Sequence, residues 1–109
     1  MKKKIYIAGC GGMLGEAFYS QFKNDYILKC TDKDVNEDWL EFLDFRERES
    51  YIKDVKEFNP DYLFHLGAYT NLEYCENNIL DTYNTNTLSV ENAVHISNSL
   101  SIPLLYIST

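Results

Sequence analysis

Four short apolar runs divide the chain into alternating segments. Each run is four or five residues long, is rich in Ile, Tyr, Leu and Phe, and is nearly continuous rather than alternating with polar residues. Such runs are typical of strands that are covered on both faces, as in a parallel sheet. The sequence therefore predicts four strands, at Ile5–Ala8, Tyr26–Cys30, Tyr62–Leu66 and Leu104–Ile107.

Apolar residues recur at helical spacing between these runs. Ser50 is expected to cap the second helix, and Asn59-Pro60 to end it, because the residue before a proline disfavours helical backbone. Pro103 ends the third helix in the same way and opens the last strand. The apolar helix faces are predicted at Met13, Leu14, Ala17, Phe18 and Phe22, at Ile52, Val55 and Phe58, and at Val90, Ala93, Val94, Ser97 and Leu100.

This alternation of strands and helices predicts an α/β fold. Right-handed crossovers give a doubly wound parallel sheet with helices on both faces. Such a sheet usually has six strands, so we expect one truncated to about four, in the order 3-2-1-4. The polar, acidic segment Thr31–Phe45, around Trp39, is left as a long irregular connection.

Length and charge narrow the function classes. The chain has 109 residues, 45% of them hydrophobic, which allows one globular domain. Its formal net charge is −7, which argues against nucleic acid as the main partner because a phosphate-backbone binder needs clustered Lys and Arg. The one basic cluster, Lys2-Lys3-Lys4, is interpreted as a solvated end of the chain.

Targeting and cysteine patterns point to a reduced, cytoplasmic protein. The apolar stretch after the lysines is too short for a signal peptide, and no run approaches the roughly 20 residues that span a bilayer. The three cysteines, Cys10, Cys30 and Cys75, lack the spacing of a zinc site or a disulfide framework. We therefore expect no metal and no membrane partner.

The stretch Ala8–Gly15 carries the clearest chemical signal. Gly9, Gly12 and Gly15 follow one another at three-residue spacing, directly between the first strand and the first helix. Such glycines allow a tight turn, a close approach of backbone to a pyrophosphate, and close packing of helix on sheet. The helix N-terminus offers N–H groups and its positive dipole end, so an acidic protein can bind an anionic dinucleotide without a basic patch.

The second strand ends beside an acidic residue with a matching role. Asp32 follows Gly9 by 23 residues, near the roughly 20 expected for the carboxylate that binds the adenosine ribose. A turn aspartate is the alternative interpretation. Asp32 favours NAD because a carboxylate repels a 2′-phosphate, whereas the neighbouring Lys33 leaves NADP open.

Together these motifs resemble the extended, nucleotide-sugar branch of the short-chain dehydrogenase/reductase superfamily, over the whole chain. The chain would then be the N-terminal part, residues 1–109, of an NAD(P)-binding Rossmann domain, with the substrate-binding part absent. Within the branch, dTDP-4-dehydrorhamnose reductases are the most similar. Besides the glycine loop, the matching segments are His65-Leu66-Gly67-Ala68, Ala68–Glu76, Thr85-Asn86-Thr87 and Ile102–Thr109.

The resemblance assigns a role to each matching position. The pyrophosphate would lie against the glycine loop, the adenosine ribose against Asp32, and the substrate carbonyl or alcohol against the Thr109 hydroxyl, the one catalytic group. The other cofactor-binding residues are Gly9, Gly11, Gly12, Met13 and Leu14 in the loop, Asp44 and Phe45 near the adenine, and Leu66, Gly67, Ala68 and Tyr69 beneath the nicotinamide half.

The implied activity is hydride transfer from NAD(P) to a 4-keto nucleotide sugar. An NAD-dependent nucleotide-sugar epimerase or dehydratase is the first alternative, and a non-catalytic dinucleotide-binding regulator is the second; a homodimer is left open. These enzymes need a Tyr-x-x-x-Lys pair, which we expect beyond Thr109. The match at Tyr19–Lys23 is interpreted as a solvated helix pair, and His65, His95 and Cys10 as structural residues.

Overall fold

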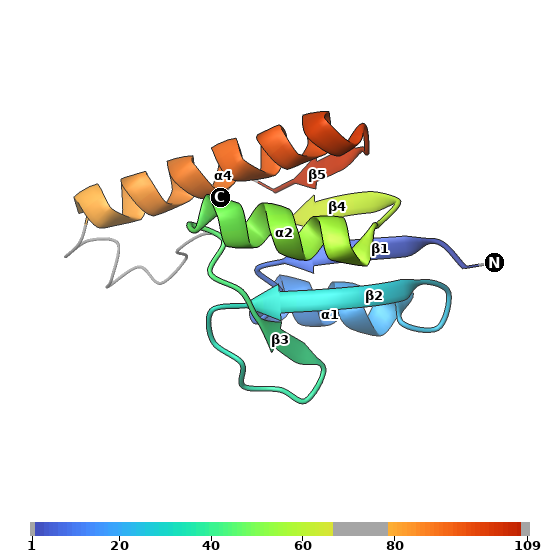
Figure 1. Ribbon diagram of the computed structural model, residues 1–109. Helices are drawn as coiled ribbons and strands as arrows, with labels where there is room; N and C mark the ends of the chain where they lie inside the picture. Colours follow the sequence, from blue (N-terminus) through green and yellow to red (C-terminus); the bar gives the residue numbers. More distant parts are fainter. Residues whose placement is uncertain (1, 67–78, 108–109) are drawn as a thin grey trace.

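The protein forms an open, parallel, five-stranded sheet in the described part of the chain (Figure 1). The structure is a computed structural model that describes residues 2–66 and 79–107. The strand order is β3-β2-β1-β4-β5. The strands are β1 (Lys4–Ala8), β2 (Ile27–Asp32), β3 (Leu40–Phe42), β4 (Tyr62–His65) and β5 (Leu104–Tyr106).

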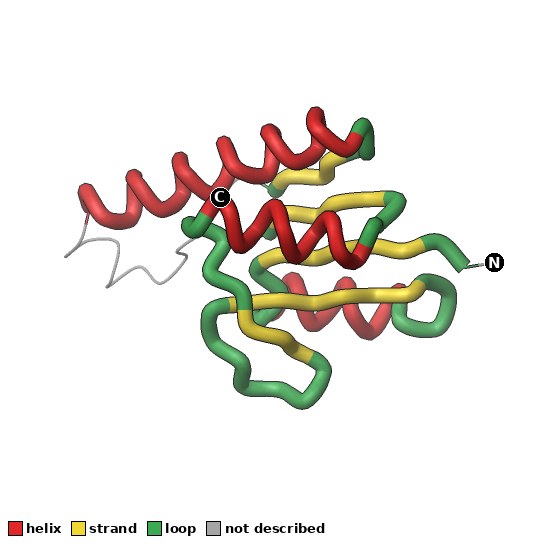
Figure 2. Tube along the Cα trace, in the orientation of Figure 1, coloured by secondary structure: helices red, strands yellow, loops and turns green. Residues whose placement is uncertain are grey.

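Helices cover both faces of this sheet. Helix α1 (Met13–Phe22) lies on one face, and α2 (Arg48–Phe58) and α4 (Ile79–Leu100) lie side by side on the other (Figures 1 and 2). The arrangement confirms the predicted doubly wound α/β class. It also brings the carboxyl ends of all five strands to one edge of the molecule, where the loops before α1 and α2 begin.

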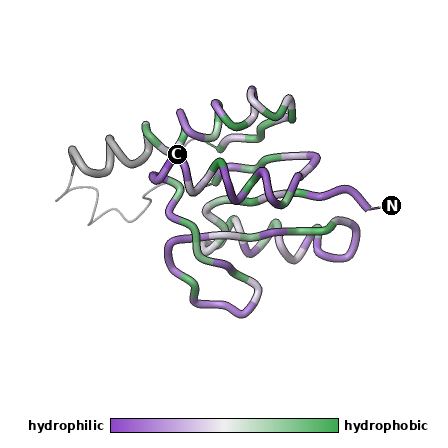
Figure 3. Tube along the Cα trace, viewed as in Figure 1, coloured by the Kyte–Doolittle hydropathy of each residue, from purple (hydrophilic) through white to green (hydrophobic). Residues whose placement is uncertain are grey.

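The central strand β1 separates two hydrophobic clusters. Its residues Ile5 to Ala8 are all buried, with alternate side chains entering opposite faces. Figure 3 shows hydrophilic positions at the N-terminus, along the connections and on much of α2. The α2/α4 face buries Tyr6, Ala8, Leu43, Phe45, Tyr51, Val55, Leu63, Ala93 and Ile96, and the α1 face buries Ile5, Ile7, Cys10, Cys30 and Leu40.

The predicted strand number and order were wrong. Strand β3 lies inside the segment that the sequence left irregular, and the Tyr62 strand pairs with β1, through Ile5 and Tyr62, rather than with β2. β3 has only three residues, and Glu41 and Phe42 are exposed, so it lacks the apolar run that marks a strand buried on both faces. When β3 is counted, the order β3-β2-β1-β4-β5 is that of a doubly wound sheet.

Helix ends were predicted better than helix starts. Asn59 ends α2 in the left-handed conformation, with φ 54°, ahead of Pro60, and α4 ends at Leu100 ahead of Pro103. The Ser50 cap was wrong, since α2 begins at Arg48 after Glu47. Glu47 makes no side-chain capping bond, so this start carries no recognisable capping residue.

The predicted helix faces were also only partly right. Phe18 and Phe22 of α1 meet Phe64 of β4, at ring-centroid distances of 5.7 and 6.3 Å. Met13 and Val94, by contrast, are exposed. Ile96 is buried although the predicted α4 face omitted it, because the direction of that face depends on where α2 lies.

A partly buried polar network fixes α2 on the sheet. The Asp54 carboxylate of α2 accepts hydrogen bonds from the Tyr6 hydroxyl (2.5 Å) and from Lys29 Nζ (2.8 Å). Burial, with the Asp54 carboxylate next in importance, raises the pKa of Tyr6, so this hydroxyl keeps its proton and remains a donor. The network therefore joins β1, β2 and α2 by charge-assisted bonds.

Helix α1 sits so close to the glycine loop that Gly15 has no room for a side chain. A Cβ there would lie 2.2 Å from the Cys10 carbonyl oxygen, whereas a Cβ at Gly12 would meet nothing within 4 Å. We expect Gly15→Ala to lower the free energy of unfolding by about 2 kcal/mol or more, because backbone must move. Gly12→Ala should cost at most about 1 kcal/mol as a weaker N-cap. Urea denaturation measures both; equal losses would contradict the close packing.

Candidate functional site

The glycine loop is fastened to the end of β2. The backbone N–H groups of Gly9 and Cys10 both donate to the Thr31 carbonyl, at 2.8 and 2.9 Å. Gly9 has a φ of 82°, which a side chain would strain. The tight turn predicted at the end of the first strand is therefore present, and it holds the loop against the neighbouring strand.

Cys10 serves this loop as a packing residue. Its side chain is buried, and its thiol donates to the Gly15 carbonyl at 3.4 Å. The neighbouring Cys30 thiol, followed by burial, raises the pKa of Cys10. Cys10 therefore stays protonated, in line with the structural role expected from the sequence.

The N-terminus of α1 opens onto free space. Gly12 is the N-cap in an extended conformation without a side-chain capping bond, and the space where its Cβ would be is empty to 4 Å. The first N–H groups of a helix have no partner within the helix, and its dipole makes this end positive. Met13 and Leu14 follow it with exposed side chains. The start of α1 at Gly12 can therefore accept an anionic group.

Asp32 lies directly against this loop. Its Oδ2 accepts the Gly11 N–H at 2.9 Å, and its Oδ1 accepts the Asp34 N–H at 3.2 Å. Each carboxylate oxygen has a second lone pair. Asp32 is thus oriented by the backbone and retains acceptor capacity for a pair of hydroxyl groups.

The turn after β3 presents a second, differently held carboxylate. Asp44 accepts from Arg46 three times, through the backbone N–H at 3.1 Å, Nε at 3.0 Å and Nη2 at 2.9 Å. The Arg46 guanidinium lowers the pKa of Asp44 below its ordinary value. Phe45 between them is buried, with its ring edge-on to His65 at 5.5 Å. Asp44 is therefore a fixed, ionised acceptor.

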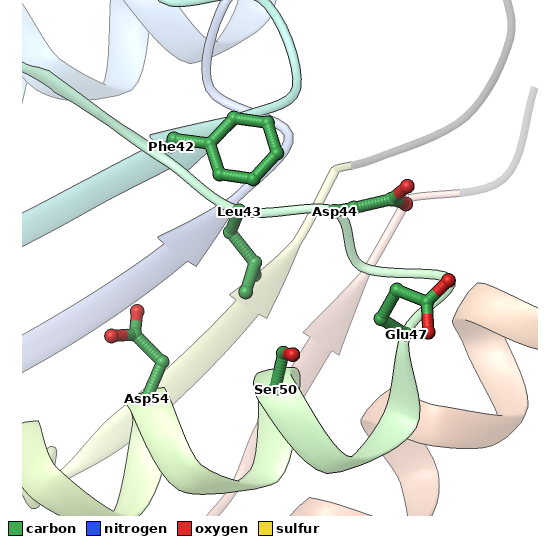
Figure 4. Close-up of a pocket in the computed structure, with 6 residues that line it drawn as sticks. All are labelled: Phe42, Leu43, Asp44, Glu47, Ser50 and Asp54. Atoms are coloured by element: carbon green, nitrogen blue, oxygen red, sulfur yellow. The ribbon is translucent and has the colours of Figure 1, made fainter.

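A cavity of about 360 Å³ runs beside this turn. It lies between α2 and the edge strand β3, and its lining residues come from these elements and the turn between them (Figure 4). Figure 4 shows the Asp44 carboxylate pointing away from Ser50 and Asp54. The cavity is lined by Phe42, Leu43, Asp44, Glu47, Ser50 and Asp54.

The predicted site residues that the structure describes lie at or just after the carboxyl ends of four strands. Gly9, Gly11, Gly12, Met13, Leu14 and Asp32 come together at the ends of β1 and β2, while Asp44 and Phe45 follow β3. Leu66 continues β4, and its N–H donates to the Ala8 carbonyl at 2.8 Å. Gly67, Ala68, Tyr69 and the catalytic candidate Thr109 lie outside the described residues.

The remaining candidates have packing roles, except His95, which is exposed on α4. His65 is buried, and its Nδ1 lies 2.8 Å from the Tyr51 hydroxyl. Tyr19 is half-buried and stacks on Trp39 at 4.1 Å. Lys23 Nζ lies 5.6 Å from the centre of the Tyr19 ring, so the predicted helix pair is present, with its tyrosine packed rather than fully solvated. Within residues 2–66 and 79–107, no cluster of His, Cys, Asp or Glu could hold a metal ion, and no helix is long and apolar enough to cross a membrane.

Two residues near Asp44 were missed by sequence reasoning. Arg46 fixes its carboxylate, and the Asp-x-Arg spacing could have suggested this pair. Asn92 of α4 donates to the Phe45 and Arg46 carbonyls, at 3.0 and 3.3 Å. No local signal marks Asn92, because its partners lie 46 and 47 residues earlier in the chain.

The Arg46 pair predicts an acid-dependent contribution to stability. Asp44 has a lowered pKa when folded, so the stabilisation is present above its ordinary value of 3.8 and is lost as the pH falls through the folded pKa. Arg46→Gln should raise the Asp44 pKa towards 3.8 in an NMR titration. Arg46→Gln should also lower the free energy of unfolding by no more than about 1 kcal/mol at neutral pH, and should leave it unchanged in strong acid. Exposed Arg48→Gln is the control; an unmoved Asp44 pKa would refute the pairing.

Comparison with known proteins places this geometry in a family. The family model described as the RmlD substrate binding domain matches residues 2–109. A curated UDP-glucose 4-epimerase of Rickettsia bellii is 32% identical over 108 residues, covering 84% of this chain and 32% of its own length. The chain thus spans about a third of the length of this relative.

Solved structures agree on the fold. L-threonine dehydrogenase from Clostridium difficile superposes with a TM-score of 0.90 at 22% identity, over 99% of this chain and 37% of its own. A dTDP-4-dehydrorhamnose reductase from Bacillus anthracis str. Ames, in complex with NADP, gives 0.84 at 26% identity, over 99% and 36%. The resemblance found in the sequence is confirmed: the chain belongs to the RmlD substrate-binding-domain family, among nucleotide-sugar oxidoreductases and epimerases of the short-chain dehydrogenase/reductase type.

Proposed function

We propose that this chain forms the cofactor-binding part of an NAD(P)-dependent nucleotide-sugar oxidoreductase that reduces a 4-keto nucleotide sugar. The proposal is carried by the 2.9 Å hydrogen bond from the Gly11 N–H to Asp32, beside the open N-cap at Gly12. This contact brings an acceptor for ribose hydroxyls next to the helix N-terminus that would bind the pyrophosphate. The family match and the NADP complex of the Bacillus anthracis relative support it.

The residues present fit a dinucleotide in physical terms. The pyrophosphate would meet the N–H groups at the start of α1, where the dipole favours negative charge. Asp32 would accept the two adenosine ribose hydroxyls and repel a 2′-phosphate, so NAD is favoured over NADP. Asp44 and Phe45 would border the adenine, and the segment from Leu66 to Tyr69 would pass beneath the nicotinamide half.

The reaction itself would depend on positions at the carboxyl edge of the sheet. Bound NAD(P)H supplies the hydride. Thr109 would donate a hydrogen bond to the sugar carbonyl and so stabilise charge developing on its oxygen. A tyrosine would protonate that oxygen, as the family resemblance implies. Catalysis by this chain's own residues therefore consists of orientation and polarisation.

An epimerase or dehydratase is the second candidate. The 32% identity to the Rickettsia bellii protein named UDP-glucose 4-epimerase favours it. Such an enzyme would use the same glycine loop and Asp32 but would keep its dinucleotide through the catalytic cycle. The third candidate, a regulator, would bind the dinucleotide without turnover.

Three outcomes with the purified full-length gene product separate these functions. A reductase should consume added NADPH or NADH only in the presence of a 4-keto nucleotide sugar. An epimerase or dehydratase should purify with bound NAD, released on denaturation, and convert a nucleotide sugar without net NADH consumption. Dinucleotide binding without either reaction would indicate the regulator. Absence of binding to NAD(H) and NADP(H) would overturn all three.

Asp32 gives a direct test of the cofactor site. We expect Asp32→Ala to weaken NADH binding about tenfold, as the loss of hydrogen bonds to one charged group requires, and to weaken NADPH binding less because repulsion of the 2′-phosphate disappears. Calorimetry measures both affinities. Asp34→Ala removes a neighbouring exposed carboxylate and should change neither. An unchanged NADH affinity in Asp32→Ala would remove Asp32 from the site.

A further inference from the structure

Asn92 connects α4 to the turn that carries Asp44. It is a buried polar residue of α4, with 5% of its surface exposed. Its side-chain nitrogen donates to the carbonyl oxygens of Phe45 at 3.0 Å and Arg46 at 3.3 Å. One amide group thus supplies donors to two successive carbonyls of a distant turn.

Contacts of Asn92, Phe45 and Arg46 hold the turn in place. Asn92 fixes its backbone carbonyls, and burial of the Phe45 ring against His65 fixes its middle. Arg46 fixes the Asp44 carboxylate through both oxygens. Without the Asn92 donors, two carbonyls in this packed region would lose hydrogen bonds, which favours a shifted turn. The orientation of Asp44 therefore depends on α4.

The hydrogen bonds leave a defined acceptor on Asp44. Among the described contacts, Oδ1 accepts the Arg46 backbone N–H and Nε–H, which fill its two lone pairs. Oδ2 accepts Arg46 Nη2–H, which leaves its second lone pair for a further donor, with the positive charge of Lys33 also acting on this carboxylate. A single fixed acceptor suits an exocyclic amino group of a nucleobase and disfavours a carbonyl at the same position.

We propose that Asn92 is a positioning residue for the nucleobase end of the dinucleotide site, fixing the Asp44 turn so that an amino-bearing base is preferred over a carbonyl-bearing one. The inference rests on the proposed function and adds to it a determinant of base specificity. Asn92 acts through the turn and touches no ligand in this scheme.

The test compares NADH with reduced nicotinamide hypoxanthine dinucleotide, in which the base amine is replaced by a carbonyl. We expect the protein to bind NADH more tightly, and Asn92→Leu, which keeps the volume but lacks both donors, to reduce this preference about tenfold, equivalent to one directed contact. Ser97→Ala removes another α4 side-chain bond, to the Ile102 carbonyl at 2.6 Å, and should leave the preference unchanged.

The outcomes distinguish a positioning role of Asn92 from a merely structural one. Equal weakening of both ligands by Asn92→Leu, or no preference in the unaltered protein, would overturn the inference while leaving the cofactor site intact. Failure of the unaltered protein to bind either ligand would overturn the proposed function itself. If Asn92→Leu does not fold, hydrogen exchange of the Asn92 side-chain amide decides. NADH should protect it more than the hypoxanthine analogue does, and equal protection would overturn the inference.

Discussion

The parallel pairing of β1 on both of its edges is the constraint from which the rest of the structure follows. β1 pairs with β2 and with β4, and Ile5 to Ala8 are buried on both faces. A strand in this position cannot shift register without exposing one whole set of side chains. The carboxyl end of β1 is therefore fixed in position. The loop that begins at Gly9 is held there by two backbone hydrogen bonds to the Thr31 carbonyl.

The protein is acidic overall, yet the start of α1 can attract an anionic group. The formal charge of −7 would repel a dinucleotide at long range, but the positive end of α1 and its N–H groups act at contact distance. Two cations near the sheet are already committed to carboxylates, Lys29 to Asp54 and Arg46 to Asp44. In the proposed dinucleotide site, backbone dipoles at the start of α1 would therefore supply attraction at contact distance.

The two carboxylates at the carboxyl edge of the sheet are oriented by different means. The Asp32 carboxylate is held by backbone N–H groups of its own strand end and of the glycine loop, and its carbonyl accepts the Leu43 N–H at 3.0 Å, so its position depends on the strands of the sheet. Asp44 is held by Arg46 on a turn that Asn92 connects to α4. In the proposed site, base recognition would therefore depend on α4 through Asn92, whereas ribose recognition would depend on the strands of the sheet.

The sequence by itself determined the strands of the buried sheet, the ends of α2 and α4 and the glycine turn, since each depends on near neighbours or on burial of a continuous run. Asn59 before Pro60 ends a helix whatever surrounds it. The tertiary structure alone decided β3, whose exposed Glu41 and Phe42 pair with β2 at the sheet edge, and with it the strand order. It also decided the burial of Ile96 and the contact of Asn92 with a turn 46 residues away. Such contacts leave no periodic or local pattern, because they depend on how two helices pack on one face of the sheet.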